Sequence, residues 1–389
     1  RGKINRALRD DNLSRTMRQL GTSSGSDYFD YLAEMPKRYF SRGELPGVDQ
    51  VSGATMAETI LSGVSTCHGC VIACGRVVKL EDGVKRKGPE YESILGFGPN
   101  LEILDLRKIT HLSELCDRYG LDTISMSNTI GLAFKLFELG IISGEDTGGL
   151  TLEWGDPDMV EALIHQTISG EGLGPHLSRG ARKLAEYFGA DDQAVQGNGL
   201  EIAYHDPRGS SGMAVVYASS PRGACHNQSD YFMVDIGASI DEIGVTMENR
   251  LGGGEKADSI ARHQDWRTVG NALVMCQFAN VPTQEVVELL SLATGFDYSL
   301  EEVMLAGERG WNMKRCFNLK MGLHASDDRL PPPLLQPYED GAANGYAPPF
   351  AEMMAAYYRV RDWDPTSGAP SRVKLAALGL DGIVVEEMK

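Results

Sequence analysis

Residues 106–123 read LRKITHLSELCDRYGLDT, and this stretch sets the pattern for the whole chain. Apolar side chains recur along it at the spacing of one face of an amphipathic helix, namely Leu106, Ile109, Leu112 and Leu115. Gly120 has no Cβ to clash in the left-handed conformation that closes many helices, so we predict that the helix ends there. Asp122 or Thr123 can then cap a second helix that runs to Gly140.

Similar periodicity predicts helices over much of the remaining chain. These helices cover residues 157–169, 174–188, 257–279, 283–294 and 299–316. The N-terminal run RALRDDNLSRTMRQLGTSS is also amphipathic. Strand-like patterns are confined to two short stretches, Gly75 to Leu80 and Met213 to Tyr217. The sequence therefore predicts a mainly α protein.

Turn-forming residues indicate where the chain divides. Gly, Asn, Asp, Pro and Ser gather in GNGLEIAYHDPRGSSG, residues 197–212. We therefore expect two domains, residues 1–197 and 198–389. A second irregular stretch, from about Asp327 to Pro349, is too long for an ordinary connection and is expected to lie along the surface or at an interface.

Composition excludes several classes of function. The 389 residues include 37 Lys and Arg against 54 Asp and Glu, and this net charge of −17 argues against nucleic acid or an anionic membrane as partner. No apolar run reaches the roughly 18 residues of a transmembrane helix, and from the opening residues we expect no signal peptide. Seven cysteines, an odd number, argue against a disulfide framework. We therefore expect a protein of the reducing cytoplasm, without a membrane span.

Three of the cysteines are closely spaced. Cys67, Cys70 and Cys74 form a CxxCxxxC run, flanked by Gly69 and Gly75. Three thiolates from one loop and a fourth ligand from elsewhere are typical of an iron–sulfur cluster or a zinc site. Zinc would usually bring a second CxxC or a pair of histidines, which favours iron–sulfur, although zinc and unligated thiols stay open. The spacing does not identify the fourth ligand.

Several runs of the chain resemble the family of tungsten-containing aldehyde:ferredoxin oxidoreductases. CHGCVIACGR, GPEYESILGFGPN and CDRYGLDTISMSN resemble its middle domain. EIAYHDPRGSSGMAVVYASSPRGACH, NALVMCQFANVP, RCFNLKMGLHASDDRLP and WDPTSGAPSRVKLAALGL resemble its last domain, in the same order. The resemblance covers essentially the whole chain and implies a multihelical two-domain array like domains 2 and 3 of that family.

The resemblance also implies an absence. Nothing in the chain resembles the family's N-terminal, mostly β domain, which forms the base under the pterins. We therefore expect that this chain is a fragment, that a separate chain supplies that domain, or that the domain has been lost. In each case we expect no turnover from this chain alone.

The family resemblance implies a [4Fe–4S] cluster and names its four ligands. The first three are Cys67, Cys70 and Cys74, and the run NALVMC places the fourth at Cys276. The remaining cysteines match no family ligand and are interpreted as core or surface thiols: Cys116, Cys225 and Cys316.

The resemblance further implies a tungstopterin or molybdopterin, held by two DxxGL[D/C] motifs. The first is intact here, with Asp117, Gly120, Leu121 and Asp122. It joins a helix end to a helix start, where backbone N–H groups and a carboxylate can grip a pterin. The second reads NALVMC, so that Asn271 replaces an acid and Met275 precedes the ligand Cys276. Asn271 keeps its hydrogen-bonding capacity but loses the charge.

A glutamate and a histidine transfer protons in the family. Here PEYE offers Glu90 and Glu92, of which Glu92 better fits the distance from the cysteine loop, and RGACH supplies His226. Tyr204 resembles a tyrosine of the substrate pocket in part of the family. The implied reaction oxidises an aldehyde to a carboxylic acid, with Glu92 as proton acceptor and His226 as donor to the developing oxyanion. Electrons then leave through the cluster to a ferredoxin-like acceptor.

Other functions remain open from the sequence. The same family could act on an activated aromatic ring within a larger complex. The chain could instead be an electron-transfer module that keeps the cluster but not the metallopterin, or a zinc-stapled helical interaction domain. A homodimer is compatible with each of these functions. The sequence does not distinguish tungsten from molybdenum, because pterin sulfurs and not side chains hold the metal.

Overall fold

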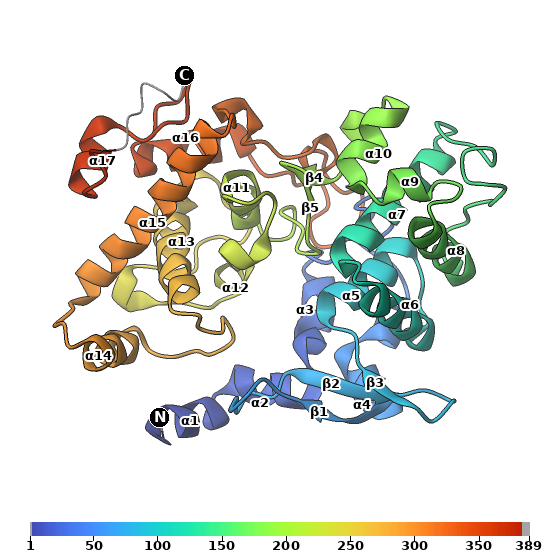
Figure 1. The fold of residues 1–389 in the computed structure, drawn as a ribbon, viewed down its shortest axis with the longest axis horizontal. Coiled ribbons are helices and arrows are strands. Elements are labelled where there is room, and N and C mark those ends of the chain that lie inside the picture. The colour runs from blue at the N-terminus through green and yellow to red at the C-terminus, as the bar shows by residue number, and fades with distance from the viewer. Residues whose placement is uncertain (1, 383–389) are drawn as a thin grey trace. The chain divides into compact units, whose positions relative to one another are not determined.

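The computed structural model describes residues 2–382, which divide into two compact units (Figure 1). The first consists of the described residues up to Gly209 together with Pro331–Ala347. The second consists of Ser210–Leu330 together with the described residues from Pro348 onward. Both units are built mainly from helices, which confirms the predicted fold class.

The first unit contains helices and two small sheets. In chain order its elements are α1 (Gly2–Asp10), α2 (Asn12–Leu20), α3 (Ser26–Tyr31), α4 (Gly53–Thr59), β1 (Leu61–Ser65), β2 (Gly75–Lys79), β3 (Lys85–Lys87), α5 (Tyr91–Phe97), α6 (Leu106–Tyr119), α7 (Thr123–Glu138), α8 (Pro157–Ser169), α9 (Gly174–Leu177), α10 (Gly180–Phe188), β4 (Gln196–Gly197) and β5 (Leu200–Glu201).

Helix α6 has the predicted bounds and buries the predicted apolar stripe. Gly120 follows it in the left-handed conformation, at φ 71°, and Asp122 caps α7 by accepting the backbone N–H of Ser125 at 2.8 Å. Helices α5, α6 and α7 pack against one another and form the core of this unit (Figure 1). The quoted stretch therefore supplies one of the three core helices and the start of a second.

Strands β1, β2 and β3 form an antiparallel sheet in that order. The register of β1 with β2 pairs Ser65 with Gly75, so residues 66–74 form the loop that closes this hairpin. The predicted strand at Gly75 to Leu80 is therefore confirmed as β2, and the cysteine run occupies the hairpin loop. Strands β1 and β3 are additional strands that the pattern did not predict.

The second unit is helical in all its regular elements of four residues or more. These are α11 (Gly212–Ser219), α12 (Phe232–Asp235), α13 (Ala257–Ala272), α14 (Thr283–Thr294), α15 (Leu300–Lys320), α16 (Phe350–Arg361) and α17 (Arg372–Ala377). Helices α13 and α15 lie side by side (Figure 1). The buried Arg361 of α16 donates to Asp265 of α13 at 2.7 Å and to Gln264 at 2.9 Å, which joins α16 to α13. No helix among the described residues is both long and apolar enough to cross a membrane.

Some predicted elements are wrong. Met213 to Tyr217 lie in α11 and not in a strand. All eight residues of α11 are buried, so no polar residues mark a helical period, and its adjacent valines imitate a buried strand. The helix predicted over 174–188 divides into α9 and α10 between Leu177 and Gly180.

Two other predicted helices are shorter than expected. The helix predicted over 257–279 ends at Ala272, because Val274 adopts a positive φ of 55°. The N-terminal amphipathic run is two helices, because Asp11 has an extended ψ of 135° and caps α2 through the backbone N–H of Ser14.

The division between the units differs from the one expected at residue 197. Strands β4 and β5 pair with each other across that position, so residues 198–209 stay with the first unit. Pro331–Ala347 returns to the same unit through the buried Asp206, Arg208 and Tyr338. Tyr338 donates its hydroxyl to Asp206 at 2.7 Å, and the guanidinium of Arg208 lies 3.6 Å from the centre of the Tyr338 ring.

We expect Arg208→Met to lower the free energy of unfolding by about 3 to 5 kcal/mol, because it leaves the carboxylate of Asp206 buried without its cation. Arg208 also donates to the backbone oxygen of Phe40 at 2.8 Å and to those of Pro333 and Gln336 at 3.2 Å. Tyr338→Phe removes a single hydrogen bond and is expected to cost less. Urea denaturation measures both, and equal losses would contradict this account.

Candidate functional site

The cysteine loop connects β1 to β2 and is shaped by its own backbone. The backbone N–H of Cys70 donates to the oxygen of Cys67 at 3.1 Å, and the hydroxyl of Thr66 donates to the oxygens of Cys67 and Cys70 at 3.0 and 3.1 Å. Gly69 and Ala73 have positive φ values of 70° and 57°. These turns bring all three thiols onto one short loop.

Arg76 fastens this loop to α2. Its side chain is 1% exposed and donates to backbone oxygens on both sides. Two of them belong to the loop, Ala73 at 2.6 Å and Cys74 at 3.2 Å, and two to the end of α2, Arg18 at 3.0 Å and Gln19 at 3.1 Å. A buried guanidinium can satisfy several carbonyls that no helix or sheet pairs. No sequence motif predicts this role of Arg76.

The three thiols differ in their surroundings. Cys67 is exposed, whereas Cys70 and Cys74 are partly buried. Burial acts to raise the pKa of the Cys70 thiol, but hydrogen bonds from the backbone of Ala73 and Ile72 and the nearby Arg18 together hold that pKa below its usual value. The N–H of Ile72 lies 3.3 Å from the sulfur. A stabilised thiolate is the form that binds metals.

The donor chemistry of the loop fits a thiolate-held cluster. Across residues 2–382, however, no three His, Cys, Asp or Glu side chains are arranged around a common point as metal ligands. The loop therefore provides the ligand type and spacing of a metal site, while its three sulfurs do not converge on one point.

The first DxxGL motif forms the turn between α6 and α7. Gly120 and Leu121 both donate their N–H to the backbone oxygen of Cys116, which is the hydrogen-bond pattern of a helix closed by a left-handed residue. The carboxylate of Asp117 pairs with Lys87 at 3.0 Å. Asp117, Gly120 and Asp122 are exposed, so the turn presents backbone and carboxylate groups at the surface of its unit.

The second motif forms a similar turn at the end of α13, although the N–H of Val274 donates to the oxygen of Asn271 at 3.2 Å and not to that of Gly270. The N–H of Met275 donates to the oxygen of Gly270 at 2.9 Å, which corresponds position for position to the bond from Leu121 to Cys116. Val274 occupies the position of Gly120, with φ 55°. A β-branched residue is strained in this conformation, and the Val274 side chain gains no burial there because it is 91% exposed.

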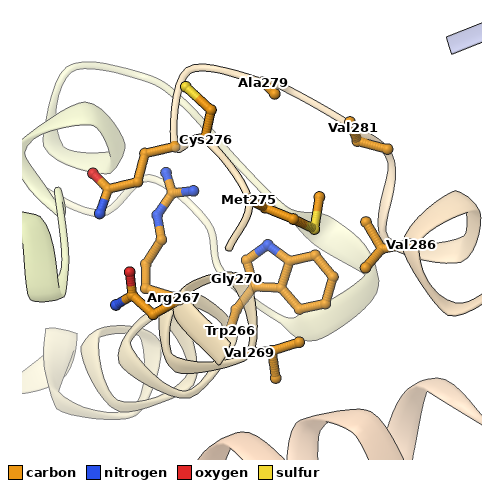
Figure 2. A pocket seen from close by; sticks show the side chains of 11 residues that line it. Trp266, Arg267, Val269, Gly270, Met275, Cys276, Ala279, Val281 and Val286 are labelled. Atoms are coloured by element: carbon orange, nitrogen blue, oxygen red, sulfur yellow. The ribbon is translucent and has the colours of Figure 1, made fainter. Parts of the chain in front are cut away.

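A small pocket lies behind this second turn (Figure 2). Met275 faces the indole of Trp266 across it, and Asn271, Cys276 and Arg267 also line it. Its volume of about 30 Å³ has room for water molecules but not for a pterin. Cys276 and Asn271 are exposed, so a cofactor would meet this turn on its outer side.

Glu92 lies in the first turn of α5 in a buried, polar environment. The backbone N–H of Tyr204 donates to one carboxylate oxygen at 2.8 Å, and Nε2 of His205 lies 3.4 Å from the other. Burial raises the pKa of the Glu92 carboxyl above its usual value, and His205 and the Tyr204 N–H oppose this. The negative charges of Asp122 and Glu34 raise it further.

Glu90 has different surroundings. It precedes α5, and its carboxylate accepts the hydroxyl of Thr22 at 2.6 Å. Thr22 also accepts the backbone N–H of Tyr91 at 2.9 Å. This side chain therefore helps to fix the start of the helix, whereas Glu92 lies next to His205 and within electrostatic reach of Asp122 in the first DxxGL motif.

Tyr204 is fully buried in the first unit. Its hydroxyl hydrogen bonds with that of Ser127 at 2.7 Å and lies 3.4 Å from the side-chain nitrogen of Asn100. A side chain on Gly96 would collide with both Tyr204 and Ser127, so glycine permits α5 and α7 to approach closely here. The tyrosine ring therefore packs the core, and its backbone N–H contacts Glu92.

His226 begins a short turn, His226–Gln228, in the second unit. The side chain of Gln277 donates to the backbone oxygen of Asn227 at 2.5 Å, which ties this turn to the segment after Cys276. Asp230 pairs with Arg267 of α13 at 2.5 Å. The segment around His226 is therefore connected to α13 through Asp230, and the turn that contains Cys276 directly follows that helix.

A buried histidine adds a second attachment of the His226 turn to α13. Nδ1 of His263 hydrogen bonds with the hydroxyl of Ser229 at 2.7 Å, and Nε2 lies 3.8 Å from Asp230. Burial lowers the pKa of His263 to about 4, against the opposing effect of Asp230, so the ring is neutral at pH 7. It therefore acts as a neutral hydrogen-bonding partner in this attachment.

Within each unit, the structure brings together part of the predicted set. In the first unit Glu92 lies beside Tyr204 and in the electrostatic field of Asp122. In the second unit Asn271, Met275 and Cys276 line one pocket. Sequence reasoning missed Glu34 and His205. His205 could have been suspected from its place between Tyr204 and the Asp-Pro-Arg run, whereas nothing near Glu34 in the sequence signals that its charge acts on Glu92.

Comparisons with known proteins match the whole chain to one family. Residues 1–380 match the family model described as aldehyde ferredoxin oxidoreductase, domains 2 and 3. A tungsten-containing aldehyde ferredoxin oxidoreductase of Pyrococcus furiosus is 32% identical over 98% of this chain and 63% of its own length. That of Pyrococcus abyssi is 33% identical over 90% of this chain and 58% of its own. The chain therefore spans about three fifths of the length of these relatives.

Two further matches are more distant. The WOR-like subunit of an aliphatic sulfonate oxidoreductase of Pyrococcus furiosus is 28% identical over 80% of this chain and 50% of its own length. Among solved structures, the active-site complex BamBC of benzoyl coenzyme A reductase has the same fold, with a TM-score of 0.72 at 17% identity. The match covers 92% of this chain and 59% of that one.

The two matched turns allow a paired test of backbone strain. We expect Val274→Gly to raise the free energy of unfolding by about 1 kcal/mol, because glycine adopts a positive φ without a Cβ clash. Gly120→Val, the reciprocal change, should lower it by about 1 to 2 kcal/mol, since an added Cβ meets nothing and leaves only the strain. Denaturant titration of both variants provides the measurement. Destabilisation by Val274→Gly would refute the strain at this turn.

Proposed function

The chain belongs to the aldehyde ferredoxin oxidoreductase family, and we propose that it supplies the cluster-binding and pterin-contacting part of an enzyme that oxidises aldehydes to carboxylic acids. Tungsten or molybdenum in a bis-pterin centre is the proposed site of oxidation. A [4Fe–4S] cluster is the proposed path for electrons to a ferredoxin-like acceptor. The main support for this proposal is that the two motifs form similar turns at the ends of α6 and α13, and that the second motif ends at Cys276.

The proposed ligands of the cluster are Cys67, Cys70, Cys74 and Cys276. The lowered pKa of Cys70 supports its role as a thiolate ligand. Exposure of Cys67 and Cys276 leaves both thiols accessible to an incoming cluster. When bound, the metallopterin supplies a two-electron acceptor and the cluster a one-electron path out.

The first turn is the stronger candidate for a pterin contact. Asp117, Asp122 and the backbone around Gly120 and Leu121 are proposed to hold the amide groups of one pterin. At the second turn, Asn271 and Met275 would offer hydrogen bonds and an apolar contact without a formal charge. Cys276 adjoins that turn directly, which supports one helix end serving both cofactors.

Glu92 is the proposed proton acceptor of the reaction. Oxidising an aldehyde with water to a carboxylic acid releases two electrons and two protons, so a base must stand near the reacting carbon. A carboxyl whose pKa is raised by burial is suited to accept a proton near neutral pH and release it again. His226 is proposed to donate a hydrogen bond to the oxyanion, held in place by the contacts of its turn with α13.

The proposed partners follow from the family. They are an aldehyde, a ferredoxin-like protein and the N-terminal pterin-binding domain that the family resemblance implies, on the same or a separate chain. Turnover is proposed to require that domain. A cytoplasmic location, with which the cysteine usage of the chain is consistent, and a homodimer are further proposals.

A second candidate is an electron-transfer module that binds the cluster without a metallopterin. The second motif favours this candidate, because Asn271 and Val274 occupy the positions where the DxxGL[D/C] pattern has an aspartate and a glycine. The two candidates differ in the heavy metal of the assembled protein. Tungsten or molybdenum together with iron supports the enzyme, and iron alone supports the module.

We expect Cys276→Ser to remove the four-iron cluster or convert it to a three-iron form, because serine oxygen replaces one of its four thiolates. Electron paramagnetic resonance of the anaerobically reconstituted chain and its iron content give the measurement. Cys316→Ser serves as the control, since that thiol is buried in an apolar cluster with Leu375 and Leu378. An unchanged four-iron spectrum in Cys276→Ser would exclude Cys276 as a ligand.

We expect Glu92→Gln in the assembled enzyme to lower kcat by about 10²- to 10⁴-fold while metal content stays unchanged, because the amide cannot accept the proton. Glu90→Gln should retain most of the turnover, since Glu90 hydrogen bonds with Thr22 at the start of α5. Steady-state kinetics with metal analysis distinguishes the two. Full turnover in Glu92→Gln with loss in Glu90→Gln would transfer the proposed role to Glu90.

A further inference from the structure

His205 lies between the fully buried carboxyl group of Glu34 and the partly buried one of Glu92. Its Nδ1 hydrogen bonds with Glu34 at 2.7 Å, and its Nε2 lies 3.4 Å from Glu92, which is long for a hydrogen bond. The side chain of Glu34 is fully buried, that of His205 is 4% exposed and that of Glu92 is 14% exposed. Exposure thus increases along the line from Glu34 to Glu92, so Glu92 is the end of the line that a substrate could reach.

Aromatic rings hold the imidazole in this orientation. The ring of Tyr91 stacks on His205, with centroids 4.9 Å apart and planes 20° apart. Phe29 packs edge-on at 5.3 Å. The hydroxyl of Tyr91 also donates to the backbone oxygen of Tyr204 at 3.0 Å, which fixes the segment that bears His205. The ring packing and the Nδ1–Glu34 hydrogen bond therefore position the imidazole with Nε2 near the carboxyl group of Glu92.

The geometry limits how protons can be distributed. A neutral imidazole has one N–H, so when the 3.4 Å separation from Glu92 closes to hydrogen-bond length, protons at both contacts require either an imidazolium between two carboxylates or a neutral ring with one protonated carboxyl. Both arrangements contain the same number of protons and the same net charge. They interconvert when one proton moves along the line of the three side chains.

We propose that Glu34 and His205 are positioning residues that form a proton relay behind Glu92. The proposal rests on the proposed function of Glu92 as proton acceptor. In the relay, a proton that reaches Glu92 from substrate forms a new O–H bond there. The proton between Glu92 and His205 and the one between His205 and Glu34 can then shift toward Glu34, so that the three groups together gain one proton and no electrons.

Other charges act on Glu92 and are included in the test. Asp122, from the turn before α7, raises the pKa of Glu92, and the Tyr204 N–H lowers it. Neither group changes in the variants described below. Direct charge repulsion predicts that removing the charge of Glu34 lowers the pKa of Glu92. The relay predicts that the same change raises the pKa of Glu92. Without the charge of Glu34 the His205 ring is neutral with its proton on Nδ1, and the lone pair of Nε2 then accepts a hydrogen bond from protonated Glu92.

The test is an infrared pH titration of the metal-free chain, in which the carbonyl band of protonated Glu92 is identified by its loss in Glu92→Gln. Glu34→Gln is expected to raise the pKa read from this band by about one unit or more. A fall or no change would overturn the relay. Because no cofactor is present, this result is independent of whether the assembled enzyme oxidises aldehydes.

Two further variants keep the test decisive. His205→Gln is expected to raise the same pKa, since the attracting ring is lost, and an unchanged value would show that the ring only packs the core. His111→Gln is the matched control, because His111 pairs with Glu161 at 3.0 Å on an exposed part of the same unit. It should leave the Glu92 band unchanged, and a shift there would show that the method does not isolate this relay.

Discussion

A helix closed by a left-handed residue is the constraint on which the candidate site depends. Such a residue reverses the chain within one turn and leaves the next amides and side chains at the helix end, open to a ligand. Both α6 and α13 end in this way, at Gly120 and at Val274. Glycine adopts the conformation without strain, whereas valine does not, so the second turn is held by its surroundings, among them the packing of Met275 near Trp266.

Buried and partly buried arginines hold the irregular segments that carry the candidate functional side chains. Arg76 binds carbonyls of the cysteine loop, Arg208 binds the returning segment Pro331–Ala347, and Arg267 pairs with Asp230 after the His226 turn. Loops lack the backbone pairing of helices and sheets, and guanidinium groups supply several donors at one point. Around Glu92, His205 and the backbone N–H of Tyr204 likewise offset part of the free-energy cost of burying the carboxylate.

Sequence reasoning predicted the elements whose pattern is local. The apolar stripe of α6, the glycine after it and the cap at Asp122 follow from spacing and side-chain chemistry alone, and they lie where expected. Helix α11 was mistaken for a strand because full burial removes the polar residues that mark a period. Glu34 and His205 are far apart in the sequence, and only the folded chain brings them together. The turn at Val274 was missed as a helix end, because valine is not a residue that normally closes helices.

Metal stoichiometry tests the central claim most directly, namely that this chain holds an iron–sulfur cluster next to a metallopterin. The measurement is elemental analysis of the anaerobically purified, assembled protein for iron, zinc, tungsten and molybdenum per chain. The account predicts about four irons together with tungsten or molybdenum. Zinc without iron would contradict it, because the CxxCxxxC loop would then be a structural zinc site in a protein that keeps the family fold alone.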